Sequence, residues 1–296
     1  MKLLDGKAAA AEWRSDIARG VEAMLSRYGR TPRLAAVLVG DDPASHTYVS
    51  LKAKACAECG IRSTVVNIEA SCSERDLLKR VEELDRDEDI DGIIVQLPLP
   101  GHIDYRKLLS RIRHSKDVDG FTPENIGRMA LGMECLPPAT PAGIIELLRR
   151  NGITTAGKHV AVIGRSNIVG RPMASLLMLK GEMGDATVTV CHGATHNLSE
   201  ITRGCDIIIS AAGRPGLVTA DMVRDGAVVV DVGTTRVDDD SRPRGYRLAG
   251  DVDFDAVAPK CSFITPVPGG VGPMTIASLL NNTLTAASRR MRRLRR

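Results

Sequence analysis

The chain has 296 residues, of which 43% are hydrophobic and 26% charged. This length suits two modest domains or one large one, with enough apolar surface for a core. No apolar run reaches the roughly 18 residues that a membrane-spanning helix needs. Asp5 and Lys7 interrupt the apolar stretch at the N-terminus, so no signal peptide is expected there. We therefore expect a cytoplasmic protein without a membrane partner.

The net charge of +4 is concentrated at the end of the chain. The last nine residues contain six arginines, and without them the net charge falls to −2. The body of the chain therefore lacks the basic character of a nucleic-acid-binding domain. Residues 289–296 form a basic tail that could contact RNA or an acidic partner, although a solvated, frayed end is the commoner case. We expect no nucleic-acid partner.

The seven cysteines are an odd number and favour reduced thiols over a disulfide framework. Cys56 and Cys59 form one CxxC motif, which could be a redox pair or half of a zinc site. No second CxxC or HxxxH motif completes a zinc set, and the pair lies inside a helical pattern. We expect buried or inert thiols and no metal.

Hydrophobic periodicity predicts alternating helices and strands in chain order. Before residue 100, helices are expected at 7–28, 44–59 and 73–85, and strands at 34–40, 63–68 and 92–97. Residues 122–140 are richer in Gly and Pro and are expected to form a junction. After it, helices are expected at 141–150, from a glycine turn to 179 and at 274–288, and strands at 159–163, 187–191, 206–210 and 227–231. This order predicts an α/β protein with two domains and mostly parallel sheets.

A glycine turn in the second half indicates a dinucleotide site. The strand at 159–163 leads directly into residues 164–172, in which Gly164 allows a tight exit and the next helix begins near Gly170. Backbone N–H groups at such a helix start favour a phosphate. The spacing is GxxxxxG and not GxGxxG, so a plain strand–turn–helix connection would also fit the motif.

The end of the next strand indicates which nicotinamide cofactor would bind. NAD sites usually place an Asp or Glu there to bind the ribose 2′-hydroxyl. Here residues 191–195 read Cys-His-Gly-Ala-Thr, without an acid, and Arg165 supplies a cation in the phosphate turn. Both features favour the 2′-phosphate of NADP.

Polar residues in the first half indicate a reaction site. Ser45, Tyr48 and Lys52 lie at positions i, i+3 and i+7 of one predicted helix and share a face. Such a stripe often faces solvent, but a lysine beside a phenol in a cleft can act as a general base. The helix follows the carboxyl end of a strand, where open α/β sheets bind ligands. Gln96 ends another strand, and Asp117 and Asp119 are expected to be exposed loop acids.

Five sequence blocks, in order and spacing, resemble the bifunctional methylenetetrahydrofolate dehydrogenase/methenyltetrahydrofolate cyclohydrolase family over about residues 1–287. The first block is residues 39–42 with Ser45, Tyr48, Lys52 and 60–61. The others are residues 95–100, 116–120, 164–166 with 169–172, and 266–275. The glycine-rich block Pro268-Gly269-Gly270-Val271-Gly272-Pro273 is highly specific on its own.

The resemblance implies an α/β fold with two domains. Residues 1–140, completed by 271–290 of the C-terminal helix, would bind folate, and a Rossmann-like domain of 141–270 would bind NADP, with the active site between them. The implied enzyme is a homodimer that oxidises 5,10-methylenetetrahydrofolate with NADP and hydrolyses the methenyl product to 10-formyltetrahydrofolate. Its place would be in one-carbon metabolism and purine biosynthesis.

The resemblance also implies roles for individual residues. Lys52 would be the acid/base of the hydrolysis, Tyr48 would orient the folate, Gln96 would bind Lys52, and Asp119 would anchor the pterin. Folate contacts are implied for Ser45, Val95, Leu97, Pro268, Gly269 and Gly270. Cofactor contacts are implied for Gly164, Arg165, Ser166 and Thr234.

The sequence departs from the family pattern at a few positions. Gly193 stands where many members carry Ser or Arg, which removes one contact to a 2′-phosphate. Thr234-Thr235 replace a more usual Ile-Asn, and Ala139 replaces a frequent Cys. Two other functions remain open: a shikimate-dehydrogenase-like oxidoreductase, and an RNA-binding protein that uses the arginine tail. The glycine-rich block and the Tyr48–Lys52 pair speak against the first.

Overall fold

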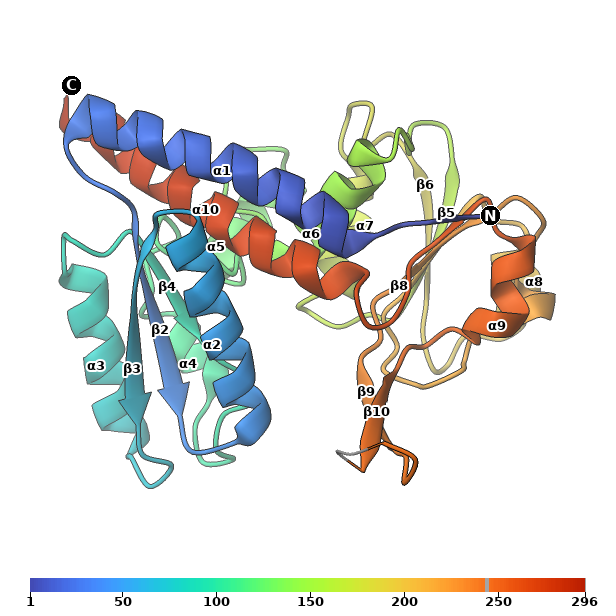
Figure 1. The fold of residues 1–296 in the computed structure, drawn as a ribbon, viewed down its shortest axis with the longest axis horizontal. Coiled ribbons are helices and arrows are strands. Elements are labelled where there is room, and N and C mark those ends of the chain that lie inside the picture. Colours follow the sequence, from blue (N-terminus) through green and yellow to red (C-terminus); the bar gives the residue numbers. More distant parts are fainter. Residues whose placement is uncertain (243–244, 296) are drawn as a thin grey trace. The chain divides into compact units, whose positions relative to one another are not determined.

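The computed structural model describes residues 1–242 and 245–295 (Figure 1). The chain forms two compact units. Unit 1 comprises Met1–Ala10 and Thr140–Thr275, and unit 2 comprises Ala11–Ala139 and Ile276–Arg296. Two long helices, α1 (Gly6–Tyr28) and α10 (Val271–Leu294), contribute residues to both units. In the described part of the chain, every helix is too short or too polar to cross a bilayer.

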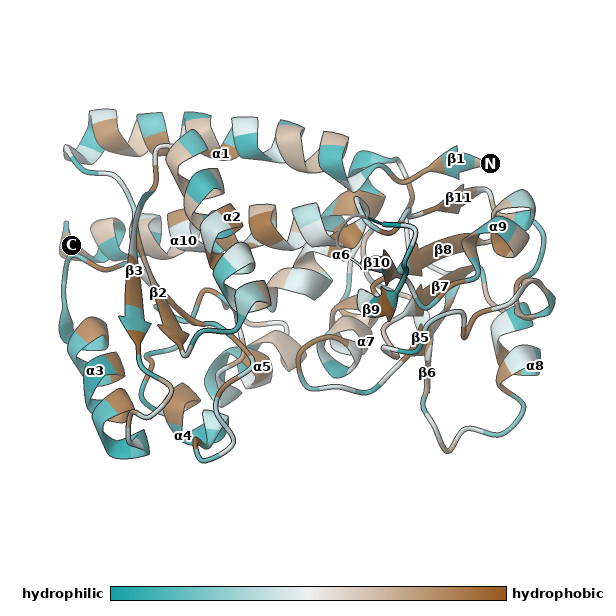
Figure 2. Ribbon diagram, turned by 60° about the horizontal axis from the view of Figure 1, so that its bottom comes forward, coloured by the Kyte–Doolittle hydropathy of each residue, from teal (hydrophilic) through white to brown (hydrophobic). Residues whose placement is uncertain are grey.

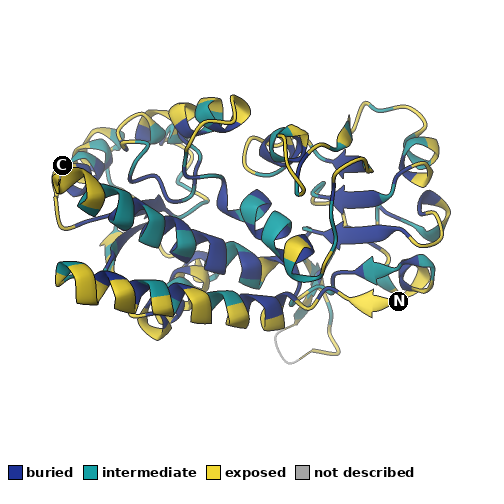
Figure 3. Ribbon diagram, turned by 90° about the horizontal axis from the view of Figure 1, so that it is seen from above, coloured by how far each residue is buried: buried dark blue, intermediate teal, exposed yellow. Residues whose placement is uncertain are grey.

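Unit 1 is built on a six-stranded parallel sheet with the order β1-β11-β8-β7-β5-β6. Its strands are β1 (Lys2–Leu3), β5 (His159–Ile163), β6 (Thr187–Cys191), β7 (Ile207–Ser210), β8 (Val228–Asp231) and β11 (Phe263–Ile264). The Val/Ile runs of β5, β7 and β8 make them hydrophobic in Figure 2 and a buried layer in Figure 3. Strands buried on both faces need such continuous apolar runs, which confirms the expected parallel sheet.

Short elements complete unit 1. The helices are α6 (Ala139–Arg150), α7 (Gly170–Met178), α8 (Leu198–Arg203) and α9 (Phe254–Val257), with 3-10 turns η1 (Ala220–Met222) and η2 (Ala258–Lys260). The strands β9 (Thr235–Asp238) and β10 (Tyr246–Ala249) pair as an antiparallel hairpin outside the main sheet. Periodicity did not predict this hairpin or the two-residue strands, because their apolar stretches are too short to form a pattern.

Unit 2 is an α/β/α sandwich around a three-stranded parallel sheet of order β3-β2-β4. Its strands are β2 (Arg33–Val39), β3 (Arg62–Ile68) and β4 (Gly92–Val95), and its further helices are α2 (Pro43–Glu58), α3 (Glu74–Arg86), α4 (Tyr105–Leu109) and α5 (Pro123–Ala130). Alternate residues of β2 enter two different cores. Leu34, Ala36 and Leu38 pack with residues of α1, α2 and α10, whereas the residues between them pack with α3 and α4.

Local sequence signals fix the limits of α2, which carries the expected reaction site. The side chain of Asp42 caps the helix by accepting from the backbone N–H of Ser45 at 2.8 Å, and Pro43 occupies the first helical position. The helix ends before Gly60, whose φ of +73° favours glycine. These signals place Tyr48 and Lys52 in the middle of α2, the helix that follows β2.

The N-terminal segment differs from the expected domain boundary. Residues 1–10 belong to unit 1, because β1 pairs in parallel with β11, from Lys2 beside Phe263. Gly6 lies so close to Gly270 that a Cβ on Gly6 would come within 1.6 Å of the Gly270 carbonyl oxygen. These pairings are formed by residues more than 250 positions apart, so no local pattern in the sequence indicates them.

Two other expectations are corrected by the structure. The junction at 122–140 contains α5, which is capped by the Thr122 side chain. Residues 289–295 of the arginine tail are not a frayed end, because α10 continues to Leu294 and Arg295 donates to the Arg27 carbonyl oxygen at 2.9 Å. Arg296 lies outside the described residues. Arg289 pairs with Glu134 at 2.9 Å, and Arg290 pairs with Asp91 at 3.2 Å. These pairs hold the beginning of the tail against the body of unit 2.

Candidate active site

Lys52 and Gln96 meet at the carboxyl end of the unit 2 sheet. Lys52 Nζ donates to Gln96 Oε1 at 3.0 Å, and Gln96 Nε2 donates to the Leu97 carbonyl oxygen at 2.7 Å. The second bond orients the amide so that its oxygen faces the lysine. Gln96 follows β4 directly, and its own N–H bonds to the Val37 carbonyl of β2 at 2.9 Å. The pair is therefore held by the sheet itself.

The polar face of α2 contains side chains with very different exposure. Tyr48 is 44% exposed, Lys52 is half-buried, and Ser45 is buried. The Ser45 hydroxyl oxygen has no hydrogen-bond partner in the described residues. A buried hydroxyl without a partner costs free energy and is available to a bound molecule. Burial raises the pKa of the nearby Cys56 thiol to about 12, as expected for an inert thiol.

The two aspartates of the 116–120 segment have different environments, which corrects the expectation that both are exposed. Asp117 is buried, and its carboxylate accepts from the backbone N–H groups of Gly120 and Thr122 and from the Asn125 amide. It is therefore a structural acceptor. Asp119 is half-buried, and its carboxylate accepts no hydrogen bond from another described residue.

The Asp119 carboxyl lies in a strongly perturbed electrostatic environment. Burial raises its pKa to about 6, against the opposing effect of the Lys52 charge, and Asp117 adds to the rise. The segment is held in place because Asn282 of α10 donates to the Val118 carbonyl at 2.9 Å. Asp119 and Lys52 are thus electrostatic neighbours although they are far apart in the sequence.

Tyr105 is a further candidate that sequence reasoning missed. Burial raises the pKa of its phenol, and the charges of Asp119 and Asp117 raise it further. The phenol therefore stays protonated beside Asp119 and can donate a hydrogen bond. A single tyrosine at the start of the short helix α4 gives no signal in the sequence.

The glycine turn of unit 1 is a strand–turn–helix cradle. Gly164 has a φ of +121°, and a Cβ there would lie 2.3 Å from the Ala211 carbonyl oxygen. A Cβ on Gly170, the first residue of α7, would lie 2.1 Å from the Gly164 carbonyl oxygen. Both positions thus require glycine. The Ser166 hydroxyl accepts from the N–H of Val169 at 3.1 Å and closes the turn.

Charges around this turn fit a phosphorylated cofactor. Arg165 is exposed, and no carboxylate in the described residues pairs with its guanidinium. The loop after β6 is closed by a hydrogen bond from the backbone N–H of His192 to the Thr195 hydroxyl oxygen at 2.8 Å. It offers no carboxylate to a ribose hydroxyl, and Gly193 has open space where a Cβ would stand. The residues present therefore fit NADP.

Two buried aspartates organise the neighbouring loops, and sequence reasoning missed both. The Asp251 carboxylate accepts from the Ser210 hydroxyl at 3.0 Å and from three successive backbone N–H groups, those of residues 212–214. Asp231 accepts from the N–H groups of Gly233, Asp251 and Val252. Burial raises the pKa of Asp231 to about 6. These carboxylates shape the loops that follow β7 and β8, at the same sheet edge as Gly164.

The remaining expected site residues fall into different environments. Thr234 is exposed in the short loop between β8 and β9, and Pro268 is exposed in unit 1. Gly269 has a φ of +108°, and Gly270 is buried, with Pro266 and Thr265 where a Cβ would stand. Val95 belongs to the core of unit 2, so only its main chain is available to a ligand. Leu97 is half-buried beside Gln96.

Comparisons with known proteins agree with this geometry. Residues 4–119 match the family model described as the tetrahydrofolate dehydrogenase/cyclohydrolase catalytic domain, and residues 138–291 match the NAD(P)-binding domain of the same family. A "Bifunctional protein FolD" of Bacteroides thetaiotaomicron is 55% identical, covering 98% of this chain and 99% of its own.

Solved structures show the same relationship. The FolD methylenetetrahydrofolate dehydrogenase/cyclohydrolase of Campylobacter jejuni is 48% identical with a TM-score of 0.92, covering 98% of this chain and 99% of its own. The Trypanosoma brucei enzyme, solved with NADP cofactor and inhibitor, is 44% identical with a TM-score of 0.92 and 97% of both chains covered. The chain is therefore an enzyme of the tetrahydrofolate dehydrogenase/cyclohydrolase family.

Proposed function

We propose that the chain oxidises 5,10-methylenetetrahydrofolate to the methenyl form with NADP and hydrolyses that product to 10-formyltetrahydrofolate. The hydrogen bond between Lys52 and Gln96 carries the proposal, because it holds a side chain that can act as acid and base at the carboxyl end of the sheet. The names of the FolD relatives support both activities. The shikimate-dehydrogenase-like and RNA-binding alternatives lack such support.

The unit 1 turn would hold NADP, which when bound supplies the hydride acceptor for the oxidation. Gly164 and Ser166 would let the pyrophosphate approach the backbone at the start of α7. Arg165 would pair with the 2′-phosphate, and Thr234 would contact the cofactor from the loop after β8. The absence of a carboxylate after β6 favours NADP over NAD in this proposal.

Lys52 would carry the proton steps of the hydrolysis. In its amine form, Nζ would take a proton from the water that attacks the methenyl carbon, and the ammonium would then give that proton to the ring nitrogen whose C–N bond breaks. The hydroxyl proton of the adduct would leave as the formyl C=O forms, so the hydrolysis releases one proton overall. Gln96 Oε1 accepts from Nζ in either form, so the amide keeps the lysine in place throughout. A neutral lysine also avoids repulsion with the cationic methenyl substrate.

The other residues would bind and orient the folate. Asp119 would accept from the amino edge of the pterin, and Tyr48 would orient the ring. The unpartnered Ser45 hydroxyl would bond to the substrate, as would the main chain around Val95 and Leu97. We also propose folate contacts for Pro268, Gly269 and Gly270.

We further propose a homodimer in the cytoplasm, working in one-carbon metabolism and purine biosynthesis. All seven cysteines lie in the described part of the chain and are free thiols, which suits a reducing compartment. Sedimentation of the purified chain tests the dimer.

The function is tested by turnover of purified protein on methylenetetrahydrofolate with NADP and, separately, with NAD. We expect reduced NADP and formyl product, and we expect Lys52→Ala to lose formyl production while hydride transfer continues. Lys54→Ala, on the exposed side of the same helix, is the matched control. No cofactor reduction with either nucleotide would overturn the dehydrogenase proposal.

A further inference from the structure

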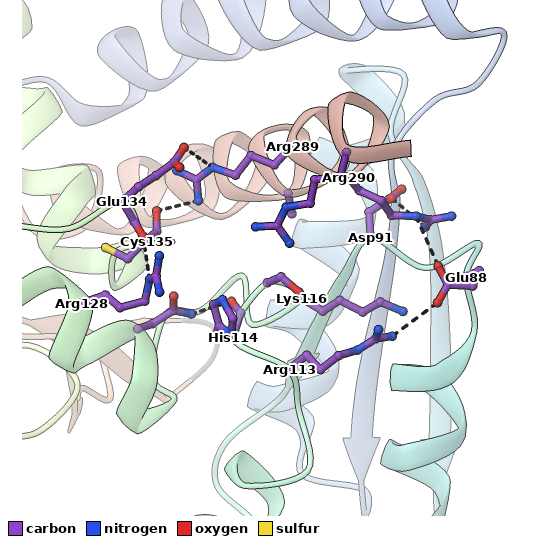
Figure 4. Close-up of a pocket in the computed structure, with 14 residues that line it drawn as sticks. Glu88, Asp91, Arg113, His114, Lys116, Arg128, Glu134, Cys135, Arg289 and Arg290 are labelled. Atoms are coloured by element: carbon purple, nitrogen blue, oxygen red, sulfur yellow. Dashed lines mark hydrogen bonds and ion pairs between the residues drawn. The ribbon is translucent and has the colours of Figure 1, made fainter. Parts of the chain in front are cut away.

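A pocket of about 140 Å³ lies within unit 2, and none of the residues proposed above for folate or NADP lines it. Figure 4 shows cationic side chains entering it from α10, from α5 and from the segment that follows α4. The lining includes six Lys or Arg side chains but only three Asp or Glu side chains. The cations are Arg113, Lys116, Arg128, Arg289, Arg290 and Arg293.

The three lining carboxylates already have cationic partners. Asp91 is fully buried and pairs with Arg30, outside the pocket lining, at 2.7 Å and with Arg290 at 3.2 Å. Glu134 pairs with Arg289 at 2.9 Å. Glu88 lies 3.5 Å from Arg290. These contacts hold the arginines in fixed positions. Outside the lining, Asp85 pairs with Arg113 at 2.9 Å and Glu124 lies 3.6 Å from Arg128, so the excess positive charge of the pocket is on the remaining cations, Lys116 and Arg293.

The excess charge is located on groups that lack a carboxylate. Lys116 is buried, and its Nζ donates only to the backbone carbonyl oxygens of Asp85 and Asp87, at 2.6 Å each. Among the described residues, no carboxylate pairs with Lys116 or with Arg293. The Nε of Arg290 is buried and makes no hydrogen bond, although it forms an ion pair with the Glu88 carboxylate at 3.5 Å. A buried cation or donor without a partner is costly unless another group satisfies it.

The electrostatics of Lys116 agree with this view. Burial lowers the pKa of its ammonium, and the neighbouring Arg113 lowers it further. An anion placed among these groups would oppose both effects. The planar guanidinium groups present several N–H donors, which match the oxygens of a phosphate group.

We propose that this pocket is a binding site for a small oxyanion, namely phosphate or the phosphate group of a larger molecule. Pockets for drug-sized ligands measure about 300–1,000 Å³, so this smaller cavity suits a single anionic group. The site requires neither folate nor NADP, and the proposal stands independently of the proposed function.

The test is calorimetric titration of the full-length protein with inorganic phosphate and with a phosphate monoester, at constant ionic strength. We expect one site per chain, with an affinity that falls at least about fivefold in Arg293→Gln. Arg292→Gln is the matched control, because Arg292 is also exposed on α10 but does not line the pocket. Tighter binding of the monoester identifies a larger ligand, and tighter binding of inorganic phosphate identifies the free ion.

Three results would overturn the proposal. Absence of binding by the wild-type protein would remove the site. Equal losses in Arg292→Gln and Arg293→Gln would indicate unspecific attraction to the end of α10. Loss of binding in Arg165→Gln, with Arg293→Gln unaffected, would assign the phosphate to the glycine turn of unit 1.

Discussion

Lys52 and Gln96, which are 44 positions apart, share a 3.0 Å hydrogen bond in which the lysine donates to an amide that is itself anchored. The anchor is the bond from Gln96 Nε2 to the Leu97 carbonyl. Because the amide nitrogen is occupied, only the oxygen faces the lysine. The partner of Lys52 is therefore neutral and places no second charge beside the lysine.

Replacing this neutral partner with a carboxylate should impair the hydrolysis. In Gln96→Glu, the negative charge would pair with Lys52 and oppose the loss of its proton, which the proposed hydrolysis requires. We expect cyclohydrolase kcat to fall at least about tenfold at pH 7 and to recover at higher pH. The measurement is a pH profile of methenyltetrahydrofolate hydrolysis. An unchanged profile would show that Gln96 does not act through the lysine.

Substrate binding should depend on the ionisation of Asp119. Because the pKa of this carboxyl is raised to about 6, it is protonated below that pH and cannot accept from the pterin as a carboxylate. We expect kcat/KM for the folate, measured with saturating NADP, to fall below about pH 6. Asp119→Asn should lower kcat/KM about tenfold or more and flatten this part of the profile.

Unfolding is a separate effect with the opposite sign for this group. The folded state binds the Asp119 proton more tightly than the unfolded state, whose pKa is 3.8. The contribution of Asp119 to stability therefore decreases as the pH rises through the window from 3.8 to about 6, and acidification favours folding at this residue. A urea titration at pH 5 checks that the loss of activity is not a loss of fold.

Cofactor preference should respond to Gly193. A Cβ at this position meets no atom within 4 Å, so a larger side chain can be accommodated. We expect Gly193→Arg to increase the preference for NADP over NAD about tenfold, through a charge-assisted bond to the 2′-phosphate. The ratio of kcat/KM values for the two cofactors is the measurement, with Gly193→Ala as the control. An equal change for both cofactors would place residue 193 away from the 2′-phosphate.

Stability should depend strongly on Asp251. Its carboxylate accepts four hydrogen bonds, so Asp251→Ala leaves one hydroxyl and three backbone donors without their acceptor. We expect the free energy of unfolding to fall by about 3 kcal/mol. Urea denaturation measures this effect. Asp255→Ala, at an exposed position in α9, should change it by less than about 0.5 kcal/mol.

The sequence by itself determined the long helices and the central strands of both sheets. These elements follow periodicities set by side-chain burial, which a sequence displays directly, whereas shorter elements such as α5 and the β9–β10 hairpin have too few apolar positions to form a pattern. The glycine turn at 164–170 is local only in part, because Gly170 is required by the carbonyl oxygen of Gly164, six residues before it. Gly164 is required by the carbonyl oxygen of Ala211, which only the tertiary structure brings beside it. The resemblance to the family then implied roles for Lys52, Gln96 and Asp119 together.

Tertiary structure alone decided how distant residues share their environments. It paired β1 with β11, buried Asp117 while leaving Asp119 half-exposed, and fixed the first arginines of the tail against Glu134 and Asp91. Each of these outcomes depends on which charges and apolar surfaces come together after hundreds of residues have folded. Burial and charge pairing are properties of that assembled environment, and a residue's sequence neighbours do not specify them.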